Sequence, residues 1–129
     1  MYLNKVMLIG NIGKDPEIKT TQSGRRVASF PLATSRAYRG KDGDKREETQ
    51  WHNIVMWGKV AETLEKCGVK RGDPLYIEGN VSYRSWDAPD GSKRYATDIV
   101  AIVFQCLRGR SAEPTAAKFA QEDDEELPF

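Results

Sequence analysis

The segment TQWHNIVMWGKVAETLEKCG, residues 49–68, decides the fold because its hydrophobic pattern changes period halfway along. In residues 49–57, aromatic and apolar side chains recur with a period of two, and this pattern predicts a β-strand with two distinct faces. One face carries Trp51, Asn53, Val55 and Trp57, and the other carries His52, Ile54 and Met56. Two indole rings therefore lie on the same side of this strand.

The second half of the segment, residues 58–68, predicts the only helix of the chain. Val60, Leu64 and Cys67 recur at helical spacing, so they fall on one side of the predicted helix. Gly68 follows the last of them and supplies a stop signal, because glycine readily adopts the left-handed conformation that ends helices.

Four further segments have the composition of strands, and polar or glycine-bearing segments connect them. The predicted strands are residues 5–12, 26–38, 74–86 and 93–107, and the main connections are a long charged loop, 39–48, and a turn, 87–92. Pro31 requires an edge or a bulge within its strand. Five strands with a helix between the third and the fourth have the layout of an OB-fold barrel. We therefore predict an all-β protein in which residues 1–108 form one OB-fold domain.

The last twenty-one residues carry neither a strand pattern nor a helix pattern. We interpret residues 109–121 as a short flexible linker and residues 122–129 as a disordered acidic tip. The acidic run ends in Leu127, Pro128 and Phe129, and a tail that served only solubility would not explain these apolar residues. The tip is therefore a candidate for binding another protein.

The charge of the chain is divided unevenly along its length. Residues 1–110 hold 19 of the 20 Lys and Arg and 13 of the 19 Asp and Glu, a balance of +6. Residues 111–129 hold one lysine and six carboxylates, a balance of −5. A basic body with an acidic tail is the asymmetry expected when the body binds a polyanion.

Other features limit the compartment and the chemistry. Cys67 and Cys106 form no paired motif, which indicates reduced thiols. With His52 as the only histidine, we expect no metal site, no cofactor and no enzyme, since the sequence identifies no nucleophile or carboxylate partner for it. No apolar run approaches the roughly 20 residues that span a bilayer, and the N-terminus lacks a basic leader. We expect a cytoplasmic protein.

Two predicted strands are apolar on both faces. In the first, Val6 and Leu8 oppose Met7 and Ile9, and residues 99–104 of the last strand alternate in the same way. A small barrel buries only one face of each strand, so the second face needs a cover. We expect self-association to provide it, with Val6 and Leu8 at the subunit interface. The alternative is a monomer in which the helix and loops overlie these strands.

Aromatic side chains with cations nearby are the candidate ligand-binding groups. Aromatic rings can stack on unpaired bases while Lys and Arg hold the phosphates. The candidate stacking residues are Trp51, Trp57, Trp86, Tyr38 and Tyr76, and the nearby cations are Arg36, Arg39, Lys59, Arg84, Lys93 and Arg94. For any single tryptophan the alternative is a place in the core. Three of them beside cations in so short a chain favour binding to single-stranded nucleic acid.

Four stretches carry a specific resemblance. They are LNKVMLIGNIGKDPE (3–17), ETQWHNIVMWGKVAE (48–62), GDPLYIEGNVSYRSW (72–86) and the acidic C-terminal segment that ends in Pro-Phe. Together they resemble the bacterial single-stranded DNA-binding proteins along nearly the whole chain. The resemblance implies a homotetramer of OB domains, associated with the nucleoid, around which single-stranded DNA wraps.

The resemblance also implies roles for individual residues. It assigns base stacking to Trp51, Trp57 and Trp86, phosphate contacts to Lys5, Lys59, Lys70, Arg71 and Arg84, and a place at the subunit interface to His52. Three positions depart from the usual pattern. Tyr38 stands where tryptophan is frequent, Trp57 where phenylalanine is usual, and Asn53 where a basic residue is common. Aromatic faces are kept, whereas one phosphate contact is lost.

In the family that the chain resembles, acidic tips recruit replication, recombination and repair proteins. The corresponding residues here are Asp123, Asp124, Glu125, Glu126, Leu127, Pro128 and Phe129. Phe129 would fill an apolar pocket of the partner, and the carboxylates would speed the encounter with a basic rim. We therefore expect a sequence-independent single-stranded DNA-binding protein. The alternatives are an OB-fold adaptor, in which the tip dominates, and a dedicated RNA binder.

Overall fold

The computed structural model describes residues 1–108 as six strands and one helix. In chain order the elements are β1 (Val6–Ile12), β2 (Glu17–Thr20), β3 (Arg26–Arg39), β4 (Lys45–Trp57), α1 (Lys59–Cys67), β5 (Pro74–Asp87) and β6 (Lys93–Cys106). The predicted linker, residues 109–121, and the predicted tip, residues 122–129, lie outside the described residues.

Five of the strands close into a barrel. The sheet has the order β1-β5-β6-β4-β3-β2, and β1 also pairs with β3. This last contact, with Asn11 opposite Ala33 and Ile12 opposite Leu32, joins the two sides of the sheet. The strands β1, β5, β6, β4 and β3 therefore form a closed ring, and α1 lies between the third and the fourth of them in chain order. The predicted five-stranded OB-fold barrel is confirmed.

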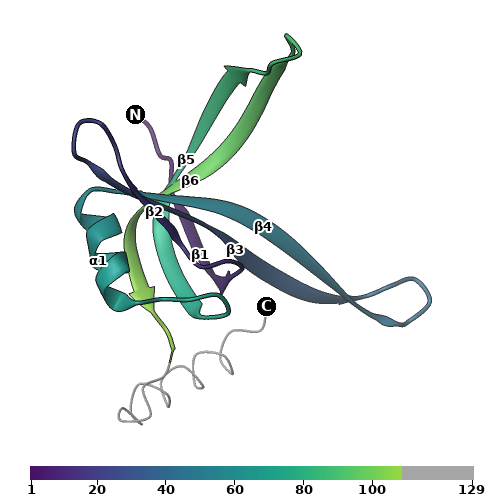
Figure 1. The fold of residues 1–129 in the computed structure, drawn as a ribbon. Helices are drawn as coiled ribbons and strands as arrows, with labels where there is room; N and C mark the ends of the chain where they lie inside the picture. The colour runs from purple at the N-terminus through teal and green to yellow at the C-terminus, as the bar shows by residue number, and fades with distance from the viewer. Residues whose placement is uncertain (109–129) are drawn as a thin grey trace.

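Two long hairpins extend beyond the barrel. Figure 1 shows β3–β4 and β5–β6 leaving it in different directions, while α1 packs against the barrel on another side. The predicted charged loop 39–48 is mostly part of the first hairpin, because β3 continues to Arg39 and β4 begins at Lys45. Charged side chains pair across these strands, as Arg36 does with Glu48, so high polarity here marks a solvent-exposed hairpin.

The short strand β2 was not predicted. Its four residues, Glu17–Thr20, pair with the first residues of β3 and lie outside the closed ring. Pro31 occupies the gap on β3 between the residues that pair with β2 and those that pair with β1. The Pro31 carbonyl accepts a hydrogen bond from the Gly13 amide, on the side away from β4. The missing amide hydrogen of Pro31 therefore costs no hydrogen bond in the β3–β4 ladder.

Helix α1 closes the core with a narrow apolar face. Ala61 and Leu64 are buried beneath it, whereas Cys67, predicted on the same side as Leu64, is exposed. Gly68 ends the helix in the left-handed conformation at φ 67°, as its position predicted. Arg26 of β3 donates hydrogen bonds to both carboxylate oxygens of Glu65, at 2.8 Å each, and this fixes the helix to the barrel.

The core fills the inside of the ring. Its fully buried large side chains are Ile12, Leu32, Ile54, Met56, Leu64, Leu75 and Ile77. On β1, Val6 and Leu8 pack against this core, whereas Met7 and Ile9 face outward and are exposed. Within residues 1–108, no helix has the length and apolar character that crossing a membrane requires.

Candidate nucleic-acid interface

All three tryptophans lie on the outer surface of the barrel or its hairpins. Trp51 is 62% exposed, Trp57 is 37% exposed and Trp86 is 43% exposed. Strand alternation explains this on β4, where His52, Ile54 and Met56 point inward and place Trp51 and Trp57 on the opposite face. The two faces of this strand are those that its sequence predicted. No indole of the chain is part of the core, so the rings are available for stacking.

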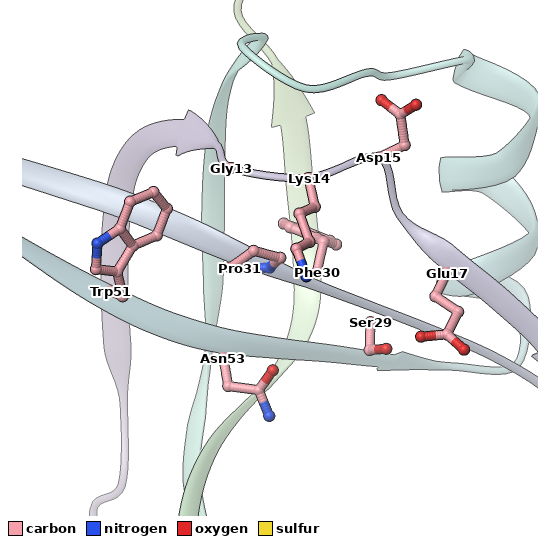
Figure 2. A pocket seen from close by; sticks show the side chains of 9 residues that line it. All are labelled: Gly13, Lys14, Asp15, Glu17, Ser29, Phe30, Pro31, Trp51 and Asn53. Atoms are coloured by element: carbon pink, nitrogen blue, oxygen red, sulfur yellow. The ribbon is translucent and has the colours of Figure 1, made fainter.

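Trp51 lies at one end of a surface groove of about 540 Å³. Figure 2 shows its lining, which comes from the loop after β1, from the start of β2, from β3 and from β4. The lining residues are Gly13, Lys14, Asp15, Glu17, Ser29, Phe30, Pro31, Trp51 and Asn53. A Cβ placed on Gly13 would overlap the six-membered ring of Trp51. The indole therefore rests directly on the Gly13 backbone, which holds one edge of the ring in place.

Trp57 lies at the end of β4, immediately before α1. The guanidinium of Arg25 lies over its ring, with the Arg25 Cζ 5.0 Å from the ring centroid. Such a cation–π contact orients an exposed ring. Arg25 forms no ion pair with any other described residue, so its charge is available to an anion beside Trp57.

The β3–β4 hairpin carries Tyr38 in a similar arrangement. Arg36 lies two residues before it on the same face, with its Cζ 5.5 Å from the Tyr38 ring centroid. The same guanidinium donates hydrogen bonds to Glu48 on β4, at 2.9 Å and 3.1 Å. Tyr38 is exposed, so this hairpin presents an aromatic face beside a cation.

The β5–β6 hairpin carries the third aromatic–arginine pair. The Arg84 Cζ lies 4.9 Å from the centroid of the Trp86 ring, and the Arg84 Nε donates a 2.7 Å hydrogen bond to Asp98. Asp98 is almost buried and also accepts a hydrogen bond from the Asn53 side chain on β4. Asn53, which stands where the resemblance implied a basic residue, is exposed on the outer face of β4 and is engaged by Asp98.

Tyr76 lies in a different environment from the other candidate stacking residues. It is half-buried on the outer face of β5, opposite Ile9 of β1. Burial and the neighbouring Glu78 carboxylate raise the pKa of the Tyr76 hydroxyl. Lys5 pairs with the same carboxylate at 2.9 Å, and this contact raises the pKa of the Lys5 ammonium. Tyr76 and Lys5 thus lie on the outer side of β1 and β5, where Met7 and Ile9 are also exposed, and we call this the apolar β1–β5 surface.

The candidate phosphate contacts fall into two groups. Four of them are already paired with carboxylates: Lys5 with Glu78, Arg36 with Glu48, Arg84 with Asp98 and Arg94 with Asp90. The other five make no ion pair with a described residue and are exposed: Arg39, Lys59, Lys70, Arg71 and Lys93. A phosphate reaches an unpaired cation without displacing a carboxylate, so the second group is the more available one.

The residues predicted at a subunit interface lie mainly on inner faces. His52 is half-buried and shares a 2.8 Å hydrogen bond with the Thr34 hydroxyl, and burial lowers the pKa of its imidazole. Val6 and Leu8 pack against the core of their own barrel. The apolar side chains that β1 presents to solvent are Met7 and Ile9.

Three features of this surface were missed by sequence reasoning. Arg25 reaches Trp57 only because β3 and β4 pair with Val27 opposite Trp57. Asp98 reaches Asn53 through the parallel β4–β6 pairing. The contact between the Trp51 ring and the Gly13 backbone depends on the position of the loop after β1.

The predicted tip residues lie outside the described residues. In residues 1–108, no group of three or more His, Cys, Asp and Glu side chains is placed to hold a metal.

Comparison with known proteins identifies the family. Residues 3–107 match the model of the single-strand binding protein family. The chain belongs to this family. The match covers the whole barrel and both hairpins, and therefore every candidate stacking residue.

Similar proteins support the assignment. The chain is 46% identical over 111 residues to single-stranded DNA-binding protein 1 of Chlorobaculum tepidum, which covers 85% of this chain and 68% of that protein. It is 42% identical over 109 residues to the single-stranded DNA-binding protein of Xylella fastidiosa, covering 84% of this chain and 66% of that one. The chain thus spans about two thirds of the length of these relatives.

Two solved structures have the same fold. The Plasmodium falciparum SSB in complex with ssDNA is similar with a TM-score of 0.71 and 31% identity, over 81% of this chain and 93% of that chain. A deletion variant of the single-stranded DNA binding protein from Thermus aquaticus has a TM-score of 0.72 and 30% identity, over 84% of this chain and 52% of that chain.

Proposed function

We propose that this protein binds single-stranded DNA without sequence preference and catalyses no reaction. The observation that carries the proposal is the exposure of all three indoles on the outer surface of a barrel that belongs to the single-strand binding protein family. An exposed tryptophan loses contact with water when a base stacks on it, and every base offers a flat face. Binding by stacking is therefore tolerant of sequence.

In this proposal Trp51, Trp57, Trp86 and Tyr38 stack on bases, and five unpaired cations contact phosphates. These five are the candidate phosphate contacts that form no ion pair with a described residue, Arg39, Lys59, Lys70, Arg71 and Lys93, and Arg36 joins them because its pair with Glu48 is exposed. Each base stack contributes about 1–3 kcal/mol to binding. Each phosphate contact releases condensed counterions, so the affinity falls as the salt concentration rises. Tyr76 is left out of the stacking set because it lies on the apolar β1–β5 surface.

The test is a titration of the full chain with oligo-dT of several lengths at two salt concentrations, followed by intrinsic tryptophan fluorescence. We expect quenching on binding and a weaker affinity at the higher salt concentration. Binding without quenching would contradict stacking, and absence of binding at low salt would contradict the function itself. A competing oligo-U that displaces oligo-dT at equal concentration would favour an RNA-binding role.

We further propose that the barrel self-associates, as a homotetramer, through the outer face of β1. Met7 and Ile9 of β1, and Ile102 and Val103 of β6 on the other side of β5, are exposed apolar side chains that support this proposal. A second copy of the chain that covers this surface would remove apolar area from water. Tyr76 and the Lys5–Glu78 pair border the same surface and would become more buried.

The acidic C-terminal tip, residues 122–129, is proposed to recruit proteins of replication, recombination and repair. The charge and the terminal Leu-Pro-Phe of its sequence support this role. Removal of residues 123–129 separates the two activities: we expect the affinity for oligo-dT to persist and the capture of partner proteins from a bacterial lysate to disappear. If the truncated chain captures the same partners, the tip is not their binding site.

A further inference from the structure

Arg84 is held between an almost buried carboxylate and an indole ring. Its Nε donates a 2.7 Å hydrogen bond to Asp98, while its guanidinium lies over the Trp86 ring with the Cζ 4.9 Å from the centroid. Asp98 is only 8% exposed and accepts a second hydrogen bond from Asn53. Both carboxylate oxygens of Asp98 therefore accept a hydrogen bond, one from Arg84 on the β5–β6 hairpin and the other from Asn53 on β4.

The position of Asp98 in the fold explains what this contact fixes. Asp98 lies opposite Asn53 at the first pair of the parallel β4–β6 ladder. Beyond this pair, residues 83–87 and 93–97 form the outer part of the β5–β6 hairpin and pair only with each other. Asp98 thus lies at the base of the hairpin that carries Trp86. Its two hydrogen bonds connect that hairpin to the strand that carries Trp51.

We infer that Arg84 and Asp98 are positioning residues for the stacking of a base on Trp86, and that Arg84 does not contact a phosphate. Asp98 fixes the guanidinium, and the planar guanidinium covers one face of the indole and leaves the other face to a base. The inference rests on the proposed function, because it assigns a support to one of the stacking residues. It changes the role that the resemblance implied for Arg84.

The other hairpin provides an internal contrast. Arg36 also lies over an aromatic ring, Tyr38, and also pairs with a carboxylate, Glu48. Here the carboxylate side chain is 39% exposed, compared with 11% for Asp98. An exposed ion pair is screened by water and salt and opens at little cost. Arg36 can therefore leave Glu48 for a phosphate, whereas Arg84 stays on Asp98.

The test measures oligo-dT affinity across a series of salt concentrations for the full chain and for Arg84→Gln, Arg84→Lys and Asp98→Asn, with Arg36→Gln as the matched control. A positioning role predicts that all three hairpin variants lose affinity by roughly fivefold or more, the range that loss of one base stack gives. The slope of log affinity against log salt stays that of the unaltered chain. Arg36→Gln lowers the slope by about 0.7, the value for one phosphate contact on a single strand.

Two results would overturn the inference. A slope reduced by about 0.7 in Arg84→Gln, with affinity restored in Arg84→Lys, would make Arg84 a phosphate contact, because lysine replaces a point charge but not a flat guanidinium. Unchanged affinity in Arg84→Gln would show that the arrangement does not contribute to binding. Arg84 has an exposed side chain, so its variants are informative even if Asp98→Asn does not fold.

A spectroscopic measurement without DNA gives an independent readout. With Trp51 and Trp57 both replaced by phenylalanine, Trp86 is the only indole of the chain. We expect Arg84→Gln and Asp98→Asn to change its emission maximum and to increase its quenching by acrylamide. An unchanged Trp86 signal in both variants would overturn the positioning role. Failure of the proposed function gives a different result: the unaltered chain would not bind oligo-dT at low salt.

Discussion

At the residue scale, the orientation of Trp51 depends on the lack of a side chain at Gly13. Gly13 lies so close to the indole that any Cβ would overlap its six-membered ring. The Gly13 backbone therefore supports one edge of the ring, while Trp51 as a whole stays 62% exposed and available for stacking. The φ of Gly13 lies outside the left-handed region, so its backbone conformation does not require glycine. Glycine is required here because the indole approaches the backbone so closely.

Gly13→Ala is expected to weaken binding to oligo-dT. The added methyl group displaces the Trp51 ring, so the loss approaches the energy of one base stack, about 1–3 kcal/mol at most. The measurement is an affinity titration at low salt. Gly68→Ala is the control, since an added Cβ on Gly68 meets no atom within 4 Å and Gly68 does not line the groove beside Trp51. Equal affinities for Gly13→Ala and the unaltered chain would show that Gly13 does not support Trp51.

At the element scale, periodic segments were predictable and polar ones were not. The period change between residues 49–57 and 58–68 predicted both β4 and α1, because burial of one face imposes a regular spacing on apolar residues. Residues 39–48 belong mostly to a hairpin that is exposed on both sides, so no apolar period marks it. Strand β2 is too short to show a period.

The residues of the candidate site also divide into those that the sequence could predict and those that it could not. The three tryptophans could be predicted as binding candidates because they lie near cations in a short sequence, and alternation places Trp51 and Trp57 together on one face of β4. Arg25 and Asp98 could not, because each reaches its partner through a strand pairing that a single sequence does not specify. The availability of each cation also depends on these pairings, since a carboxylate on a neighbouring strand decides whether it is already neutralised.

Helix α1 provides the prediction at this scale. Gly68 ends the helix at φ 67° with open space around it, so an alanine there meets no clash and only the backbone conformation is strained. Gly68→Ala is expected to lower the free energy of unfolding by about 1–2 kcal/mol. Urea unfolding measures this change. The affinity for oligo-dT should stay the same, and a stability equal to that of the unaltered chain would contradict the role of Gly68.

At the scale of the whole molecule, the barrel has two separate exposed surfaces. One carries open indoles beside cations, and the other is the apolar outer face of β1 and β6, with Met7, Ile9, Ile102 and Val103. The first surface suits a polyanion with flat bases. The second suits another copy of the chain, since it is apolar and lies on barrel strands.

Self-association through β1 predicts that Ile9→Lys produces smaller assemblies. Ile9 is exposed in the single chain, so a lysine there leaves the barrel core intact but places a charge in the proposed interface. Light scattering after size-exclusion chromatography gives the mass. Gln22→Lys, on an exposed turn between β2 and β3, is the control and should keep the mass of the unaltered chain. A mass unchanged in Ile9→Lys would exclude this face as the interface.

The most direct measurement compares the oligo-dT affinities of Trp51→Ala and Trp86→Ala with that of Tyr95→Ala at one low salt concentration. Tyr95 is exposed on the β5–β6 hairpin, on the face opposite Trp86, and controls for loss of any surface aromatic ring. Base stacking on the indoles predicts that each tryptophan variant binds about fivefold or more weakly, equivalent to at least about 1 kcal/mol per stack. Tyr95→Ala should bind within about twofold of the unaltered chain. Unaltered affinity in both tryptophan variants would contradict the account.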